Sequence, residues 1–281
     1  MRGQGSYKIM INATTLKKNK DQKYVIQANT PDLFILDLAE TGNDVFLIVE
    51  KDSHVDISVI NLTSDIHLHI DVEDNSFVNI AILDHKETKS FKITANVGYK
   101  STFTGYFADF ITGKCKGDIL INLNKEYATC DWHLASLSMN QDNKEFDVSV
   151  YHNAINTYAQ MDNYGVCRDN GRLVFSGICQ IVKGSHGSKA HQNAKIMVFD
   201  ELSNGVAKPI LKIDENDIEA SHAAVVGKIN DEHIFYLTSR GLTEDEAKRI
   251  ITLGYLKPII KGFTDDELKV EIEELIEGKV E

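Results

Sequence analysis

Apolar and polar residues alternate in short segments along most of the chain, from about Lys8 to Leu211. Clusters of Asn, Asp, Gly and Lys separate these segments, as is typical of strands that are half buried in a core. In Ile66–Val72, aliphatic residues share one face while His67, His69 and Asp71 share the other, because successive side chains of a strand point to opposite sides. The pattern predicts about ten strands, recurring about every 10 to 12 residues.

This spacing fits two architectures, a sandwich or barrel and a solenoid in which each coil adds a strand to stacked parallel sheets. Three features favour the solenoid: the chain has only 3 prolines, the turn dipeptides Asn-Gly and Asp-Gly are scarce, and the polar faces are rich in Asn, Thr, Ser and His. No strict repeat is visible, so the pattern by itself leaves both architectures open.

The pattern changes to helices in the C-terminal part of the chain. The segment Asp231–Arg240 is followed by Gly241, the residue type that most often ends a helix in the left-handed conformation. Thr243 and Glu246 form a capping box that predicts the start of a second helix. Its apolar stripe consists of Ala247, Ile250, Ile251, Gly254 and Tyr255, and Pro258 is expected to end or kink it.

A further capping box, Thr264 with Glu267, predicts a C-terminal helix. The apolar seam of this acidic helix consists of Leu268, Ile272 and Leu275. The predicted division is therefore a strand-rich core over residues 1–212 and a helical region over residues 213–281.

Composition narrows the function classes. Of the 281 residues, 42% are hydrophobic and 26% are charged, so the chain is expected to fold around a sizeable core. The net charge of −12 repels a phosphate backbone and argues against nonspecific binding to nucleic acid. The apolar runs are far shorter than the about 20 residues that cross a bilayer, and the N-terminus lacks the apolar region of a signal peptide. We therefore expect a cytoplasmic protein that does not bind membranes and keeps its cysteines reduced.

The C-terminal part of the strand region and the first helix contain four short motifs in a fixed order. They are Ala190-His191-Gln192-Asn193 before a strand, Lys208-Pro209-Ile210-Leu211-Lys212-Ile213, Ser221-His222-Ala223-Ala224-Val225-Val226-Gly227, and Phe235-Tyr236-Leu237-Thr238-Ser239-Arg240-Gly241. Together they resemble the C-terminal core of the SufB/SufD family, scaffold components of the iron–sulfur cluster assembly machinery. The chain resembles a short, minimal member that lacks the family's N-terminal helical extension.

The resemblance implies a right-handed parallel β-helix followed by a small C-terminal helical region. It also implies that the chain pairs with itself or with a SufB/SufD paralogue through the β-helix, and that the C-terminal helices, with their apolar seam, dock the ABC-type ATPase SufC. The sequence has no phosphate-binding loop, since Gly227-Lys228 is followed by Ile229 and lacks the upstream glycine. The expected role is thus a noncatalytic scaffold for a transient iron–sulfur cluster, with ATP hydrolysis supplied by the partner.

His222 is the first candidate for binding the cluster or its metal, because it coincides with the family's histidine at the dimer interface. Glu219 is a candidate co-ligand, and Cys167 is a candidate for handling sulfur, since the adjacent Arg168 could lower the pKa of its thiol. Two departures from the family pattern are Ala220, where the family commonly has cysteine, and Ala223, where it has glycine.

The other histidines and cysteines carry weaker expectations. Cys179 is expected to be a buried, inert residue, Cys115 to lie in an exposed turn between two lysines, and Cys130 stays unassigned. The resemblance puts His186 and His191 in a loop, while His67 and His69 share one strand face and would suit a transition metal if that face were exposed. Two other function classes stay open: a β-helical enzyme acting on polysaccharide or acyl substrates, and a structural partner of a cluster-bearing paralogue.

Overall fold

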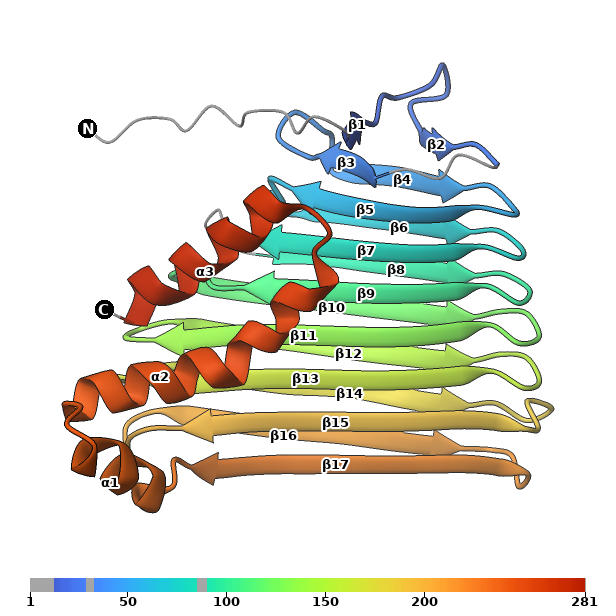
Figure 1. Cartoon of the computed structure of the whole chain (residues 1–281). Coiled ribbons are helices and arrows are strands. Elements are labelled where there is room, and N and C mark those ends of the chain that lie inside the picture. Colours follow the sequence, from blue (N-terminus) through green and yellow to red (C-terminus); the bar gives the residue numbers. More distant parts are fainter. Residues whose placement is uncertain (1–12, 29–32, 85–89, 281) are drawn as a thin grey trace.

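The strands form two parallel sheets that together make a β-helix (Figure 1). The computed structural model describes residues 13–28, 33–84 and 90–280. The nine-stranded sheet contains the odd-numbered strands: β1 (Ala13–Thr15), β3 (Leu33–Asp37), β5 (His54–Ile60), β7 (Phe77–Asp84), β9 (Thr102–Asp109), β11 (Thr129–Met139), β13 (Tyr158–Arg168), β15 (Ser188–Val198) and β17 (Ile218–Lys228). The eight-stranded sheet contains the even-numbered strands: β2 (Tyr24–Ile26), β4 (Asp44–Val49), β6 (Ile66–Val72), β8 (Ser90–Val97), β10 (Lys114–Leu123), β12 (Asn143–His152), β14 (Arg172–Ile181) and β16 (Asn204–Ile213).

The chain crosses from one sheet to the other after nearly every strand, and each strand pairs in parallel with the strand two places away in sequence. In Figure 1 the front strands run to the left and the back strands to the right while the chain descends, which makes the coil right-handed. The predicted right-handed parallel β-helix is confirmed, and the sandwich or barrel alternative is wrong, because those folds would pair neighbouring strands through hairpins.

The inward-facing side chains of both sheets fill the coil with one continuous apolar core. The four aliphatic residues of Ile66–Val72 are buried as predicted. Aromatic rings contact one another at the centre: Phe91 of β8 stacks on Phe107 of β9 with ring centroids 5.0 Å apart, and Phe146 and Phe175 of successive coils pack as a tilted pair at 6.2 Å. Burial of apolar surface in each added coil is what stabilises a solenoid.

The corners of the coil explain the scarcity of glycine-based turns. The non-glycine residues in the left-handed region are mostly Asn and Asp, such as Asn75 (φ 56°) and Asn156 (φ 55°), which tolerate this conformation better than other non-glycine residues. Buried serines stack at one corner, where the Ser76 amide donates to Ser101 Oγ and the Ser53 amide donates to Ser76 Oγ. Polar groups that the turns bury are thereby paired.

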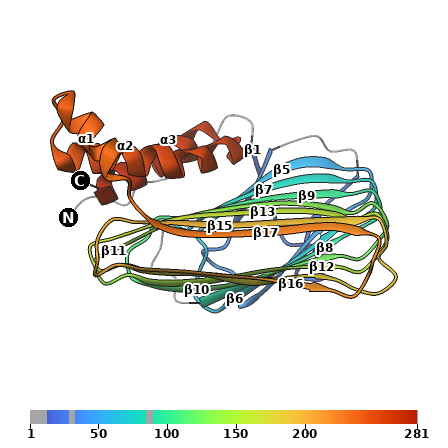
Figure 2. The same ribbon diagram turned by 90° about the horizontal axis from the view of Figure 1, so that it is seen from below.

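The helices lie along the outer face of the nine-stranded sheet, at one side of the coil (Figures 1 and 2). They are α1 (Asp231–Ser239), α2 (Glu244–Leu256), the 3₁₀ helix η1 (Lys257–Gly262) and α3 (Asp266–Val280). Their buried side chains form a second apolar core with outward-facing residues of the sheet, including Ala108, Leu137 and Val166. None of the helices in the described part of the chain is long and apolar enough to cross a membrane.

The helix boundaries test the predicted caps. Gly241 has a φ of 99° after α1, and the Thr243 capping box at the start of α2 is present in both directions. The predicted cap at Thr264 is wrong, because Asp265 Oδ1 accepts hydrogen bonds from the amides of Glu267 and Leu268. A carboxylate at the N-terminus of a helix also interacts favourably with the helix dipole.

Two other expectations about the helical region need correction. Ile250, expected in the buried stripe of α2, is exposed, and Leu256 is buried there instead. The strands do not stop at residue 212: β17 continues the sheet to Lys228, and the first helix begins at Asp231. α2 ends at Leu256, just before Pro258, as expected.

Candidate functional site

The last coil, formed by β16 and β17, leaves the interior of the β-helix open to solvent. Figure 2, which views the molecule from this end, shows the helices beside the sheet and away from the opening. Inward-facing residues of these two strands pack on the core with one side only: Ala207, Leu211, Ile213, Ile218 and Ala220. Both strands also present an edge that no described strand covers. We call this surface, formed by β16 and β17, the open end.

His222 lies at the open end, in the inward-facing row of β17. Its register partner is Gln192 of β15, whose side chain is buried inside the coil. Since register partners share a face, the His222 imidazole projects over Gln192 at the opening, where it is exposed. The buried Gln192 Oε1 has no hydrogen-bond partner among the described residues. The opening therefore combines an accessible imidazole with an unsatisfied amide oxygen below it.

Glu219 is not placed to bind the same metal ion as His222. The two residues are three positions apart on a strand, so they point to opposite faces. On the outer face, Glu219 Oε2 forms an ion pair with Lys189 Nζ at 3.0 Å. The hydrogen bond from this lysine lowers the pKa of the Glu219 carboxyl. His191 belongs to β15 instead of the expected loop, and its Nε2 lies 3.9 Å from Glu219 Oε1.

Cys167 is also separate from His222. Cys167 of β13 is the register partner of Val198 on β15, which in turn is the register partner of Lys228 on β17. Lys228 is six residues from His222, or about 20 Å along the strand. The thiol is fully buried, and burial raises its pKa to about 12. The expectation that Arg168 would lower this pKa is wrong, because burial dominates and the Arg168 guanidinium is paired with Asp169 at 2.7 Å.

The remaining cysteines are buried as well. Cys179 was expected inside the core and lies there, while Cys115, expected in an exposed turn, is a buried residue of β10. Burial raises the pKa of all three thiols of Cys115, Cys130 and Cys179. The described part of the chain thus offers no accessible thiolate in this conformation.

A second site lies in a pocket of about 330 Å³ between the nine-stranded sheet and the segment 254–261. The imidazole of His133 stacks on Tyr106 there, with ring centroids 4.7 Å apart. Its Nε2 is 3.0 Å from Asp131 Oδ1, and its Nδ1 is 3.9 Å from Asp162 Oδ2. Sequence reasoning missed this group, because the register of β11 on β13 and the position of the helices bring its members together.

The open end can be compared with what an iron–sulfur cluster requires. Iron in a cluster prefers thiolate ligands and accepts imidazole and carboxylate less often. Among the described residues, β17 supplies one imidazole at the opening, that of His222, and an alanine, Ala220, two positions before it. The described residues at the opening therefore offer fewer ligands than an iron–sulfur cluster requires.

The fold and the open end define the class of protein: a parallel β-helix with an uncovered last coil and a helical segment packed on one sheet. Residues 36–255 match the family described as "SUF system FeS cluster assembly, SufBD core domain". This match covers most of the chain, and the chain belongs to the SufBD family of the SUF system for iron–sulfur cluster assembly.

Curated relatives agree with this family. The chain is 31% identical over 140 residues to the iron-sulfur cluster assembly protein SufD of Bacillus subtilis, a match that covers 50% of this chain and 32% of the relative. It is 33% identical over 190 residues to a SufBD family protein of Mycobacterium bovis, covering 67% of this chain and 21% of the relative. A SufBD family protein of Staphylococcus epidermidis is 25% identical over 237 residues, or 84% of this chain and 46% of the relative. The chain thus spans less than half the length of these relatives.

Proposed function

We propose that this chain is a noncatalytic scaffold of the SUF machinery that binds a transient iron–sulfur cluster, as cargo, at the open end of its β-helix. The observation that carries the proposal is the exposed His222 in the inward row of an uncovered last coil. Membership of a family for iron–sulfur cluster assembly supports the proposed cargo, and the exposed position of His222 supports the open end as its binding site.

Pairing of two chains at the open end completes this site. The edge strands β16 and β17 have free backbone donors and acceptors, and apolar side chains there, such as Ile210, Val225 and Val226, are exposed. Unpaired edges and exposed apolar residues favour association with another chain. The second chain, either a copy of this one or a SufB/SufD-type paralogue, contributes the further ligands.

The ATPase that drives the cycle docks on α1 in this proposal. The apolar seam of α3, which was expected to bind the ATPase, is not accessible. Its residues Leu268 and Ile272 are buried against the chain's own sheet. In contrast, α1 buries none of its residues, and its Phe235 is 73% exposed next to the exposed Tyr236. An exposed aromatic pair is a common anchor of protein interfaces. The partner is an ABC-type ATPase of the SufC kind.

The test is to coexpress the chain with the SUF ATPase of the same organism and to purify the complex under anaerobic conditions. We expect the ATPase to copurify and the complex to show visible iron–sulfur absorbance. His222→Ala should lose about 90% or more of this absorbance without loss of the ATPase, because the imidazole is the proposed ligand and makes no hydrogen bond or ion pair with the described residues. Phe235→Ala should lose the ATPase.

Matched controls separate these roles from general damage. His186→Ala removes another exposed histidine and should retain the absorbance, and Phe77→Ala removes a phenylalanine that is 52% exposed on the β-helix and should retain the ATPase. Unchanged absorbance in His222→Ala would refute the assignment of the cluster site. Retained ATPase in Phe235→Ala would refute α1 as the docking surface.

The pocket around His133 favours one alternative, an enzyme that acts on polysaccharide or acyl substrates, because it places an imidazole between two carboxylates. Absence of both ATPase and absorbance from the purified wild-type chain would favour this alternative.

A further inference from the structure

Three side chains with metal-binding atoms lie together on the outer face of the eight-stranded sheet. Asp44 comes from β4, and His67 and His69 come from β6, near the end of the sheet opposite to β16. Asp44 and His67 are register partners on strands that run about 4.8 Å apart. His67 and His69 are two positions apart on one strand, so both point to the same side, which is the solvent side.

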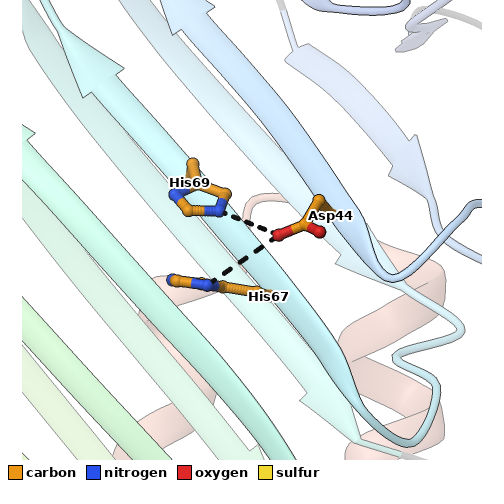
Figure 3. A group of neighbouring side chains, drawn as sticks. All are labelled: Asp44, His67 and His69. Atoms are coloured by element: carbon orange, nitrogen blue, oxygen red, sulfur yellow. Dashed lines mark hydrogen bonds and ion pairs between the residues drawn. The ribbon is translucent and has the colours of Figure 1, made fainter.

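The ligand atoms of this group are already close to one another. Asp44 Oδ1 lies 3.3 Å from His69 Nε2 and 4.0 Å from His67 Nδ1. Figure 3 shows both imidazoles directed at this carboxylate oxygen, and the three atoms all lie within 4.8 Å of one another. Neighbouring ligand atoms around a tetrahedral Zn²⁺ are about 3.3 Å apart. Small side-chain rotations are therefore enough to enclose an ion.

Neighbouring residues hold the two imidazoles in place. His67 Nε2 lies 2.9 Å from Thr94 Oγ1, and with the proton on Nε2 the lone pair of Nδ1 faces Asp44. The ring of His69 stacks on Phe46, with centroids 4.5 Å apart and an interplanar angle of 8°. A hydrogen bond to the far nitrogen and a stacked ring are contacts that orient a metal-binding histidine before the ion arrives.

The geometry points to a binding site for a divalent first-row transition metal, such as Zn²⁺, with Asp44 Oδ1, His67 Nδ1 and His69 Nε2 as ligands. Two imidazoles and a carboxylate are a ligand set that zinc and iron(II) both accept. The side chains are partly exposed, with 66% of the Asp44 side chain accessible, so water completes the coordination and the ion exchanges with solvent. This inference is independent of the proposed scaffold function.

Charged residues next to the site affect how strongly it binds a cation. Lys92 of β8 is the register partner of His67 on the side away from Asp44, and its positive charge opposes cation binding. Asp44 offsets this charge. Lys92→Ala is therefore expected to strengthen metal binding, whereas removal of any of the three ligands should weaken it.

The experiment is a calorimetric titration of Zn²⁺ into the full chain after treatment with a chelator. We expect one dominant site, weakened about 100-fold or more in His67→Ala, His69→Ala and Asp44→Ala, since loss of an orienting contact alone typically costs about 10- to 100-fold. Thr94→Val should fall in that lower range. His54→Ala, which removes an exposed histidine of β5 outside the group, should bind as the wild type does.

A second measurement works without any variant. Titration of the wild-type chain with Zn²⁺, followed by long-range ¹H–¹⁵N NMR of the imidazole nitrogens, should shift His67 Nδ1 and His69 Nε2 first. Absence of Zn²⁺ binding in the wild-type chain would overturn the inference. So would binding that the His67→Ala and His69→Ala variants retain, or first shifts at other histidines.

Discussion

His152 is an imidazole enclosed in the interior of the β-helix, at the end of β12. Its Nδ1 lies 2.7 Å from Thr157 Oγ1, and its Nε2 lies 3.7 Å from Cys179 Sγ. Both contacts suit a neutral ring, and burial lowers its pKa to about 4. The folded state therefore binds this proton far less readily than the unfolded chain, whose histidines have a pKa of about 6.5.

This difference predicts how stability depends on pH. Between pH 6.5 and pH 4 the unfolded state binds the proton and the folded state does not, so stability is fully present above pH 6.5 and is lost as the pH falls through this window. The contribution of His152 is about 3 kcal/mol, from about 1.4 kcal/mol per pKa unit. Chemical denaturation at pH 7 and pH 4 should show this loss in the wild type and not in His152→Asn.

Exposed histidines give the control for this prediction. His186→Asn should keep the pH dependence of the wild type, because it removes an exposed imidazole and leaves the buried His152 in place. Buried carboxylates such as Asp142 have a lowered pKa and act below this window. An equal loss of stability in wild type and His152→Asn would show that His152 is not the titrating group.

At the scale of single elements, the sequence predicted a helix cap correctly only where a single residue was a good candidate for it. The Thr243 capping box is confirmed because its two hydrogen bonds lie within four consecutive residues. The prediction at Thr264 failed because Asp265, the next residue, is an equally good cap and provides two hydrogen bonds. The seam of α3 was correctly predicted as apolar, but its partner is a sheet distant in sequence, which no local pattern reveals.

The C-terminal helix α3 is fixed to the β-helix by Lys279, a largely buried lysine near its end. Lys279 Nζ donates to Asp142 Oδ2 at 2.7 Å and also to the carbonyl oxygens of Ile111 and Leu137. Burial lowers the pKa of Lys279 to about 8, so the ammonium is still mostly charged at pH 7. Next to it, the fully buried Lys144 pairs with Asp109 at 2.9 Å.

Removal of this charge should loosen the helix. Lys279→Met is expected to destabilise the chain by about 3 kcal/mol, because it leaves the buried Asp142 carboxylate without its cation. Hydrogen exchange at the last turns of α3 should accelerate accordingly. Lys269→Met, on the same helix but paired at the surface with Asp266, should cost about 0.5 kcal/mol or less. Equal effects of the two substitutions would contradict the anchoring role of Lys279.

For the whole molecule, the alternation along the chain indicated strands but not how they pair, because parallel and antiparallel strands share a period of two. The choice of a β-helix came from family motifs. If Glu219 and His222 had been assigned to one strand, the period of two would have predicted that their side chains point to opposite faces. The approach of Asp44 to His67 depends on the register of two strands about one coil apart, and so it needed the structure.

The open end makes a final prediction about assembly. Val226 lies in the inward row of β17 and is 45% exposed, so a lysine there should place a charge in the surface that we expect to face another chain. If two copies meet at this end, each copy buries the added charge in the interface, which should weaken the dimer about tenfold or more. Light scattering after size-exclusion chromatography should show a dimer for the wild type and a monomer for Val226→Lys.

The matched control is Val270→Lys on α3, where the valine is 55% exposed and distant from the open end. It carries the same change of charge and should leave the dimer intact. A valine that is already half exposed contributes little to the stability of a single chain, so both variants should unfold like the wild type. A dimer that survives Val226→Lys, or a wild-type chain that stays monomeric at all concentrations, would exclude self-pairing through β16 and β17.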